Sequence, residues 1–297
     1  MTDRNIVAQL VLVLVTFFWG STFLTLQIAL QWADPVVIVA MRFVLASFII
    51  FCLLKGRVDQ ITRYEWKAGF FIGCSIFGVY TLQTIGLQSI PSSTSAFLTG
   101  LYVAFVPLFQ WLVFKVVPTI SMIITVILAF VGMTLFANPF TVSITGQAGE
   151  WITVASAAIC AVEILTISHF AKGCRPLPLS FTQLVTVAAL ALLTLVFHTP
   201  VRPIEFTLGL GICISMLAAI VGFVQFSIGW ALKYVSAIRA TLIYALEPVF
   251  AGIIGWLAGE RLGLSELAGA TLIVTAVLLT AWKPSKRNVK KETGNAT

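Results

Sequence analysis

Ten apolar stretches of about twenty residues, separated by short polar breaks, restrict the fold of this chain more than any other feature. The chain has 297 residues, of which 59% are hydrophobic and only 10% are charged, whereas soluble domains carry about 25% charged residues. A helix needs about 20 mostly apolar residues to cross a bilayer. The sequence therefore predicts an all-α integral membrane protein with ten transmembrane helices. The expected spans are residues 6–30, 35–54, 66–88, 95–117, 119–137, 148–170, 179–197, 206–232, 237–257 and 265–282.

The basic residues support ten spans and predict an orientation. With ten spans, fifteen of the 18 Lys and Arg residues fall on the side of the termini, Arg202 and Arg261 fall on the other side, and Arg42 lies inside a span. Because cytoplasmic loops carry an excess of Lys and Arg, we expect a protein of the plasma (inner) membrane with cytoplasmic N- and C-termini. The basic residues flank spans and form no basic face, so the expected partner is the lipid bilayer and no nucleic acid is expected.

An internal repeat is indicated by matching residues in the two halves. When the halves are aligned so that Pro35 falls on Pro176, Pro107 falls on Pro248. This predicts two five-helix repeats, residues 6–137 and 148–282, followed by a basic disordered tail at 283–297. Five spans is an odd number, so the second repeat is expected to be inverted, as in many secondary transporters. Pro107 and Pro248 are then predicted to be hinges between moving parts.

Three ionisable residues lie inside spans, where a charge costs about 2.5 to 3.5 kcal/mol and therefore usually faces a cavity or a partner. Glu163 is predicted to be a counter-ion for a substrate amine or a proton-binding carboxylate, and the alternative is a structural pair with Arg42. For Arg42 the structural charge pair is the favoured interpretation. For Glu247 two interpretations stay open: substrate binding, or repair of the backbone defect that Pro248 creates.

Polar and aromatic residues recur at helical spacing within the spans, which predicts a cavity lined by rings and a few hydrogen-bonding groups. A cation over Trp or Tyr gains about 0.5 to 2 kcal/mol, so rings beside carboxylates favour an amine-bearing amphiphile as the small-molecule substrate. The glycine pairs Gly69–Gly73 and Gly255–Gly259 are expected to serve helix packing. The predicted substrate-binding residues are Trp19, Tyr80, Gln83, Thr99, Tyr102, Glu163, Gln225, Tyr244 and Glu247.

Catalysis is not expected. The five cysteines form no CxxC pair, the two histidines lie near opposite ends of adjacent spans, and neither GxSxG nor a Walker sequence occurs, so we expect no metal, no cofactor and no enzyme activity. No channel filter is expected from three buried charges. A membrane receptor that transports nothing is the alternative from another functional class, and a homodimer is left open.

Several motifs in this order resemble the EamA family of the drug/metabolite transporter superfamily. They are Trp19-Gly20-Ser21-Thr22-Phe23, Pro35 with Arg42, Lys233-Tyr234-Val235-Ser236-Ala237, and Glu247-Pro248-Val249-Phe250 through Gly259-Glu260-Arg261-Leu262. The resemblance covers residues 6–282 and implies a metabolite transporter with two repeats and a central cavity. One departure is Phe114-Lys115-Val116-Val117, where the second repeat has Gly259-Glu260-Arg261.

The sequence thus predicts a secondary active transporter, working by alternating access, that exports amino acids or other amine-bearing or aromatic amphiphiles. The alternative is a proton-coupled or exchange-type importer of a small solute such as a nucleobase, a choline-like compound or a sugar.

Overall fold

The computed structural model describes residues 3–115, 117–137, 146–197, 203–257 and 263–282, and all regular structure in these ranges is helical. The expected all-α class is therefore confirmed. The Gly259-Glu260-Arg261 motif, Arg202 and the tail at 283–297 lie outside the described residues. The helices are α1 (Asp3–Ala29), α2 (Pro35–Leu53), η1 (Val58–Gln60), α3 (Arg63–Gly86), α4 (Ser92–Thr99), α5 (Tyr102–Phe114), α6 (Ile120–Phe136), α7 (Ala148–Phe170), η2 (Ala171–Gly173), α8 (Pro176–Phe197), α9 (Leu208–Ala231), α10 (Ala237–Tyr244), α11 (Glu247–Leu257) and α12 (Leu264–Trp282).

Seven helical segments are long and apolar enough to cross a membrane by length and composition, among the described residues. They are Asp3–Ala29, Pro35–Leu53, Arg63–Gly86, Thr94–Val113, Ala148–Gly173, Pro176–Phe197 and Leu208–Ala231. Two further apolar helices, Ile120–Phe136 and Leu264–Leu279, are shorter. The expected span at 237–257 is divided between α10 and α11. The count of ten spans therefore stays a prediction.

Helix boundaries follow polar residues that satisfy the first backbone N–H groups of each helix. Thr62 forms a capping box with Glu65 at the start of α3, and Thr119 and Thr207 cap α6 and α9. Asp34 caps α2, whose first residue is Pro35. These local signals explain why most expected boundaries lie within a few residues of the observed ones.

Two expected spans, 95–117 and 237–257, are each broken into two helices. Pro248 lacks an N–H group and its ring clashes with the carbonyl four residues earlier, which belongs to Tyr244, and α10 ends at that residue. In the first half the break follows Thr99, at Gly100 and Leu101, while Pro107 lies inside α5. The two prolines therefore have different structural effects.

The register between the halves also differs from the expected one. Helices α2 and α8 begin at Pro35 and Pro176, as the proline alignment predicts. The pairs α3 and α9, α4 and α10, and α5 and α11 share a larger shift, with starts at 63 and 208, 92 and 237, and 102 and 247. The shift changes because the stretch from the start of α8 to that of α9 is longer than the stretch from α2 to α3. Pro107 and Pro248 therefore do not occupy equivalent positions, and that part of the prediction is wrong.

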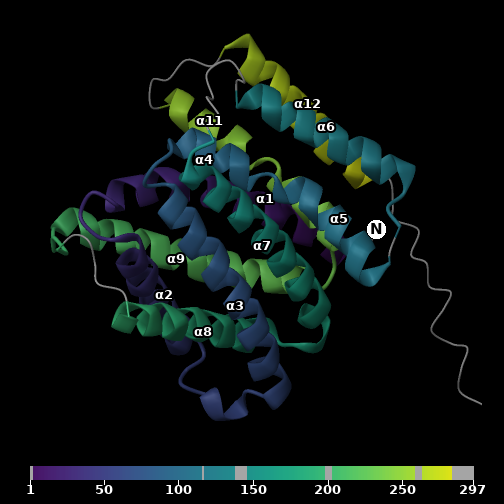
Figure 1. Cartoon of the computed structure of the whole chain (residues 1–297). Helices are drawn as coiled ribbons and strands as arrows, with labels where there is room; N and C mark the ends of the chain where they lie inside the picture. The colour runs from purple at the N-terminus through teal and green to yellow at the C-terminus, as the bar shows by residue number, and fades with distance from the viewer. Residues whose placement is uncertain (1–2, 116, 138–145, 198–202, 258–262, 283–297) are drawn as a thin grey trace, which may run out of the picture.

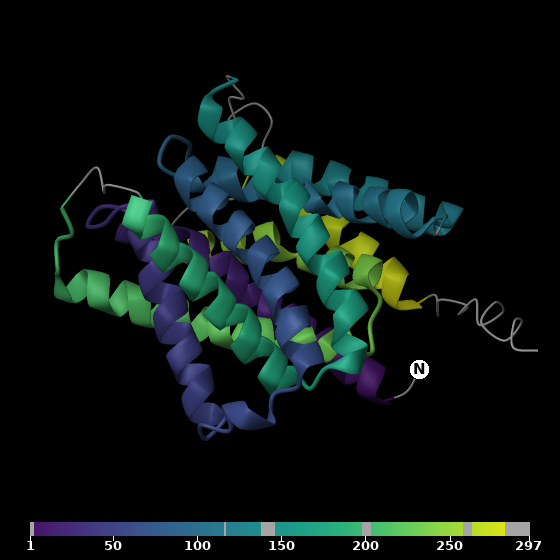
Figure 2. The same ribbon diagram turned by 60° about the horizontal axis from the view of Figure 1, so that its bottom comes forward.

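Helices of each half pack mainly against helices of the other half, and we call this the exchanged packing (Figures 1 and 2). Helix α3 packs against α7 and α8, and its counterpart α9 packs against α1 and α2. Helix α2 packs on α8, and α6 packs on α12 at one edge of the bundle. Helix α5 likewise packs against α7, and α11 packs against α1, so the main contacts between the halves have counterparts in which the halves are swapped.

Close helix contact depends on glycine at the predicted pair Gly69 and Gly73. A Cβ at Gly69 would overlap Thr182 of α8, and one at Gly73 would lie 2.6 Å from Cβ of Thr186. The predicted packing role of this pair is confirmed. Of the second pair, Gly259 lies outside the described residues.

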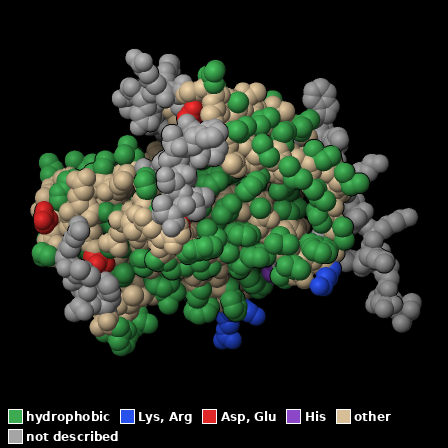
Figure 3. All heavy atoms as spheres, turned by 45° about the horizontal axis from the view of Figure 1, so that its top comes forward, with side chains coloured by type: hydrophobic (Ala, Val, Ile, Leu, Met, Phe, Trp, Pro, Cys, Tyr) green, Lys and Arg blue, Asp and Glu red, His purple; other side chains and the backbone are tan. Residues whose placement is uncertain are grey.

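The outer surface is rich in apolar side chains. Figure 3 shows one face on which hydrophobic side chains predominate, with charged side chains near its margin. Such a surface suits a bilayer, where apolar side chains contact lipid and charges lie toward the headgroups.

Candidate functional site

Eight polar or charged side chains from eight helices meet in the interior, and we call them the central cluster. Each is at most 4% exposed. They are joined by hydrogen bonds, a cation–π contact and electrostatic interactions. The members are Arg42 (α2), Tyr80 (α3), Tyr102 (α5), Glu163 (α7), Gln183 (α8), Gln225 (α9), Tyr244 (α10) and Glu247 (α11).

A hydrogen-bonded chain crosses three helices and ends on a carboxylate. Gln183 Nε2 donates to Gln225 Oε1 over 3.2 Å, and Gln225 Nε2 donates to Glu163 Oε1 over 3.1 Å. The second oxygen, Glu163 Oε2, is buried and has no hydrogen-bond partner among the described residues. The carboxylate is therefore held in place through one oxygen while the other is free to accept a bond.

A second carboxylate repeats this arrangement at the break between α10 and α11. The Tyr102 hydroxyl donates to Glu247 Oε2 over 3.3 Å, and Glu247 Oε1 has no partner within the described part of the chain. Tyr244 ends α10, and its buried hydroxyl is likewise unpartnered there. The ring of Tyr244 makes an edge contact with Trp19 at a centroid distance of 5.7 Å.

The pair between Arg42 and Glu163, the structural alternative for Glu163, is not formed among the described residues. The guanidinium carbon of Arg42 lies 4.5 Å from the ring centroid of Tyr80 and 5.2 Å from that of Phe43. Within the described ranges, Nε and Nη2 of Arg42 have no hydrogen-bond partner, and the residue makes no ion pair. Tyr80 contacts Arg42 and interacts electrostatically with Glu163 and Glu247, so its ring is a neighbour of the cation and of both carboxylates.

Two predicted site residues form a separate buried pair. Gln83 Nε2 donates to Thr99 Oγ1 over 3.1 Å, which links α3 to the end of α4. Both lie within three residues of a cluster member in the sequence, Tyr80 and Tyr102 respectively. Trp19 reaches the cluster through Tyr244. The structure thus brings the predicted residues together, apart from this pair.

Gln183 is a cluster member that sequence reasoning missed. A signal for it was present in the repeat. The alignment of Pro35 with Pro176 holds for α2 and α8, and in this alignment Gln183 is the residue of the second half that corresponds to Arg42. A single amide in an apolar span attracts less attention than a charge, since it costs less to bury.

A different buried carboxylate, Glu65, lies near the start of α3 and is fully engaged. Its carboxylate accepts hydrogen bonds from the backbone N–H groups of Arg175 and Thr62, from Nε and Nη2 of Arg175, and from Thr62 Oγ1. The hydrogen bond to Glu65 raises the pKa of Arg175. Because all these donors belong to the protein, this group fastens the start of α8 to that of α3.

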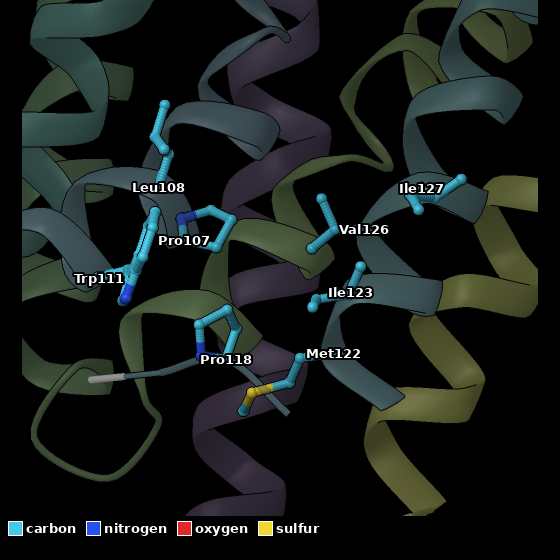
Figure 4. A pocket seen from close by; sticks show the side chains of 8 residues that line it. All are labelled: Pro107, Leu108, Trp111, Pro118, Met122, Ile123, Val126 and Ile127. Atoms are coloured by element: carbon cyan, nitrogen blue, oxygen red, sulfur yellow. The ribbon is translucent and has the colours of Figure 1, made fainter. Parts of the chain in front are cut away.

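An apolar surface groove of about 210 Å³ lies between α5 and α6 (Figure 4). It shares no residue with the central cluster and offers almost no polar surface, so it does not suit a charged solute. The groove is lined by Pro107, Leu108, Trp111, Pro118, Met122, Ile123, Val126 and Ile127.

Known proteins resemble this chain over nearly its whole length. An uncharacterized transporter of Archaeoglobus fulgidus is 32% identical over 93% of this chain and 86% of its own. An S-adenosylmethionine/S-adenosylhomocysteine transporter of Chlamydia trachomatis is 23% identical over 81% of this chain and 78% of its own. A crystal structure with 16% sequence identity superimposes with a TM-score of 0.76 over 93% of this chain and 97% of that one, which shows a shared fold.

The model of the EamA-like transporter family matches residues 6–138 and again residues 147–282. The double match agrees with the exchanged packing of the two halves. Both relatives described above are named as transporters, not as enzymes. With its apolar helices and buried polar centre, the chain therefore belongs to the EamA-like transporter family and is a membrane-integral transporter of the drug/metabolite type.

Proposed function

We propose that this protein is a secondary active transporter that exports small amine-bearing metabolites, amino acids or related aromatic amphiphiles, through the central cluster. One observation carries the proposal. Two buried carboxylates, Glu163 and Glu247, each keep one oxygen without a partner in the described structure, beside the rings of Tyr80, Tyr102 and Tyr244.

The energetics of burial favour an amine as the missing partner. An ionised carboxylate without a partner in a low-dielectric interior costs several kcal/mol. A substrate ammonium group donates up to three hydrogen bonds and cancels the charge, and a cation over an aromatic ring adds about 0.5 to 2 kcal/mol. Glu163 and Glu247 would therefore be substrate-binding residues, and Gln225 and Tyr102 would hold them in position.

The architecture suits alternating access. We propose ten spans arranged as two inverted five-helix repeats, residues 6–137 and 148–282, with cytoplasmic termini in the plasma (inner) membrane. The exchanged packing of the halves supports this plan, as do the breaks between α4 and α5 and between α10 and α11. Broken helices at equivalent places in two halves are typical of transporter binding sites. Pro248 would ease bending at the break between α10 and α11, and Pro107 would ease bending inside α5.

The Chlamydia relative, named as a transporter of S-adenosylmethionine and S-adenosylhomocysteine, is compatible with this substrate class. Both compounds bear a primary amine and a planar aromatic base. A sequence identity of 23% does not assign these compounds to this chain, so the substrate class here rests on the cluster itself.

A metabolite comparison tests the proposal. Cells that overexpress the protein, or its Glu163→Gln variant, are compared with control cells for compounds that accumulate in the medium. These compounds are then assayed in proteoliposomes. We expect wild-type protein to release amine-bearing compounds and to move them across the liposome membrane, and Glu163→Gln to lose both effects. Transport restricted to compounds without an amine would overturn the proposed class.

A further inference from the structure

Arg42 is a buried charge that the binding of an amine does not use, because a cation does not bind an ammonium group. Its side chain is 2% exposed, it comes from the middle of α2, and it is the only cluster member with a permanent positive charge. Two of its nitrogens, Nε and Nη2, have no hydrogen-bond partner in the described part of the chain. A guanidinium pairs with a carboxylate through two parallel N–H groups, and Nε and Nη2 are one of the pairs that can do so.

A purely structural role does not account for this arrangement. The contacts with Tyr80 and Phe43 orient the guanidinium group, yet they satisfy none of its N–H groups. Arg175 shows how this chain satisfies an arginine that has a structural role, since its Nε and Nη2 both donate to Glu65. Arg42 lacks such a partner among the described residues, although it is far more buried than Arg175.

The equivalent positions of the two halves differ in polarity. In the observed registers, Arg42 corresponds to Gln183, and Tyr102 corresponds to Glu247. Tyr80 corresponds to Gln225, which holds Glu163. The first half thus contributes the cation, whereas the second contributes the carboxylates and the amides, and both halves contribute tyrosine hydroxyl groups. The cluster therefore combines a cation from the first half with two carboxylates from the second, and Tyr80 interacts with all three.

We propose that Arg42 binds the carboxylate of the substrate while Glu163 and Glu247 bind its ammonium group, so that the preferred substrates are small zwitterions bearing both groups. This inference rests on the proposed function and deepens it. Arg42 is then the residue that determines preference for an amino acid over a plain amine. A phosphate is disfavoured, because its two charges would meet one cation and two carboxylates.

The test uses purified protein and two matched sets of probes, the twenty L-amino acids and their carboxamides. A carboxamide keeps the size and the amine but removes the negative charge. Binding is measured by thermal shift and by competition against the best-bound amino acid. For wild-type protein we expect at least one amino acid to bind, and to bind at least tenfold more tightly than its carboxamide.

The Arg42→Gln variant should lower this ratio of affinities at least tenfold, and Arg42→Lys should lower it less, because lysine keeps the charge but not the paired N–H groups. Arg175→Gln is the matched control and should keep the wild-type ratio. Retention of the wild-type ratio in Arg42→Gln overturns the inference. So does a wild-type protein that binds carboxamides as well as acids, or that binds neither set. If Arg42→Gln fails to fold, the wild-type ratio and Arg42→Lys decide.

The two proposals fail in different ways. Transport of amines without preference for their carboxylated forms would remove the role of Arg42 and leave the proposed export of amines intact. Absence of transport for every compound that accumulates in the medium would remove the proposed function itself.

Discussion

Glu65 and Glu163 are both buried carboxylates in helices of this transporter, yet their surroundings differ. Glu65 accepts five hydrogen bonds, from Arg175 and Thr62. Glu163 accepts one, from Gln225, and its other oxygen has no partner in the described chain. Glu65 also lies beside an exposed arginine, whereas Glu163 lies among fully buried groups.

The difference separates a carboxylate that stabilises the fold from one that is kept for a ligand. A charge that the protein satisfies completely has nothing left to bind, and its removal should weaken the fold. A charge that the protein leaves partly unsatisfied destabilises the empty protein and is expected to bind a substrate. Opposite effects on stability and on transport should therefore follow when the charge is removed at the two places.

The largest effect is expected from Glu163→Gln and Glu247→Gln. Loss of a buried charge partner for the ammonium group costs about 2 to 5 kcal/mol, roughly 30-fold to several thousand-fold in affinity. Thermal stability without substrate should stay the same or rise, because an uncompensated charge is removed. Uptake into proteoliposomes and thermal unfolding measure the two quantities. A fall in stability with unchanged uptake would make these carboxylates structural.

Glu65→Ala should have the opposite result. Removing one member of a buried ion pair costs about 3 to 5 kcal/mol, and we expect the lower end because Arg175 remains 53% exposed and hydrated. Thermal unfolding should show this loss, while substrate affinity below the unfolding transition should persist. Asp59→Ala, an exposed acid in η1 near Glu65 in the sequence, is the control and should change stability by less than about 0.5 kcal/mol.

A smaller effect on both properties is expected from Gly73→Ala. The added Cβ would lie 2.8 Å from the carbonyl oxygen of Gln183 and would push α8 away from α3. Overpacking of this kind costs about 1 to 3 kcal/mol, and it should also weaken substrate binding through Gln183. Gly211→Ala is a control without neighbours within 4 Å and should be neutral or slightly stabilising. Equal effects of the two substitutions would contradict the packing at α3 and α8.

The smallest effect is expected from the prolines. Pro248→Ala restores an N–H that can bond to the Tyr244 carbonyl, so it should straighten the break beside Glu247 and slow transport several-fold while binding persists. Pro107→Ala should slow transport less, because Pro107 lies inside α5 and away from the break. Transient uptake kinetics beside equilibrium binding distinguish the two steps, and unchanged rates in both variants would remove the hinge hypothesis.

Much of the fold was predictable because its signals are local. The span expected at 148–170 coincides with α7, and Asp34 with Pro35 marks the start of α2. The breaks were missed, since a helix-breaking residue in a membrane span usually only bends the helix and the apolar run continues across it. The alignment of the two halves was predicted correctly for α2 and α8 alone. The stretch from α8 to α9 is longer than the one from α2 to α3, and an alignment based on matching prolines does not reveal this extra length.

Most residues of the candidate site could be predicted from the sequence, but the contacts and hydrogen bonds between them could not. Glu163 and Glu247 were identified because buried charges in lipid are rare. The pairing of Arg42 with Glu163 was plausible from charge alone, and the structure instead places Arg42 over Tyr80. Whether a given oxygen has a donor depends on side chains from other helices, and no spacing within one span carries that information.

The sequence by itself determined three things: that this protein is integral to a membrane, at which residues most of its helices begin, and which charges are buried. It could do so because hydropathy and capping act within a few residues. Only the tertiary structure decided which buried groups are satisfied. Glu65 meets Arg175, and Tyr102 meets Glu247, although each pair is far apart in the chain, because helix packing brings distant segments together. The unsatisfied atoms of Arg42, Glu163 and Glu247, on which the proposed transport site rests, are a product of that packing.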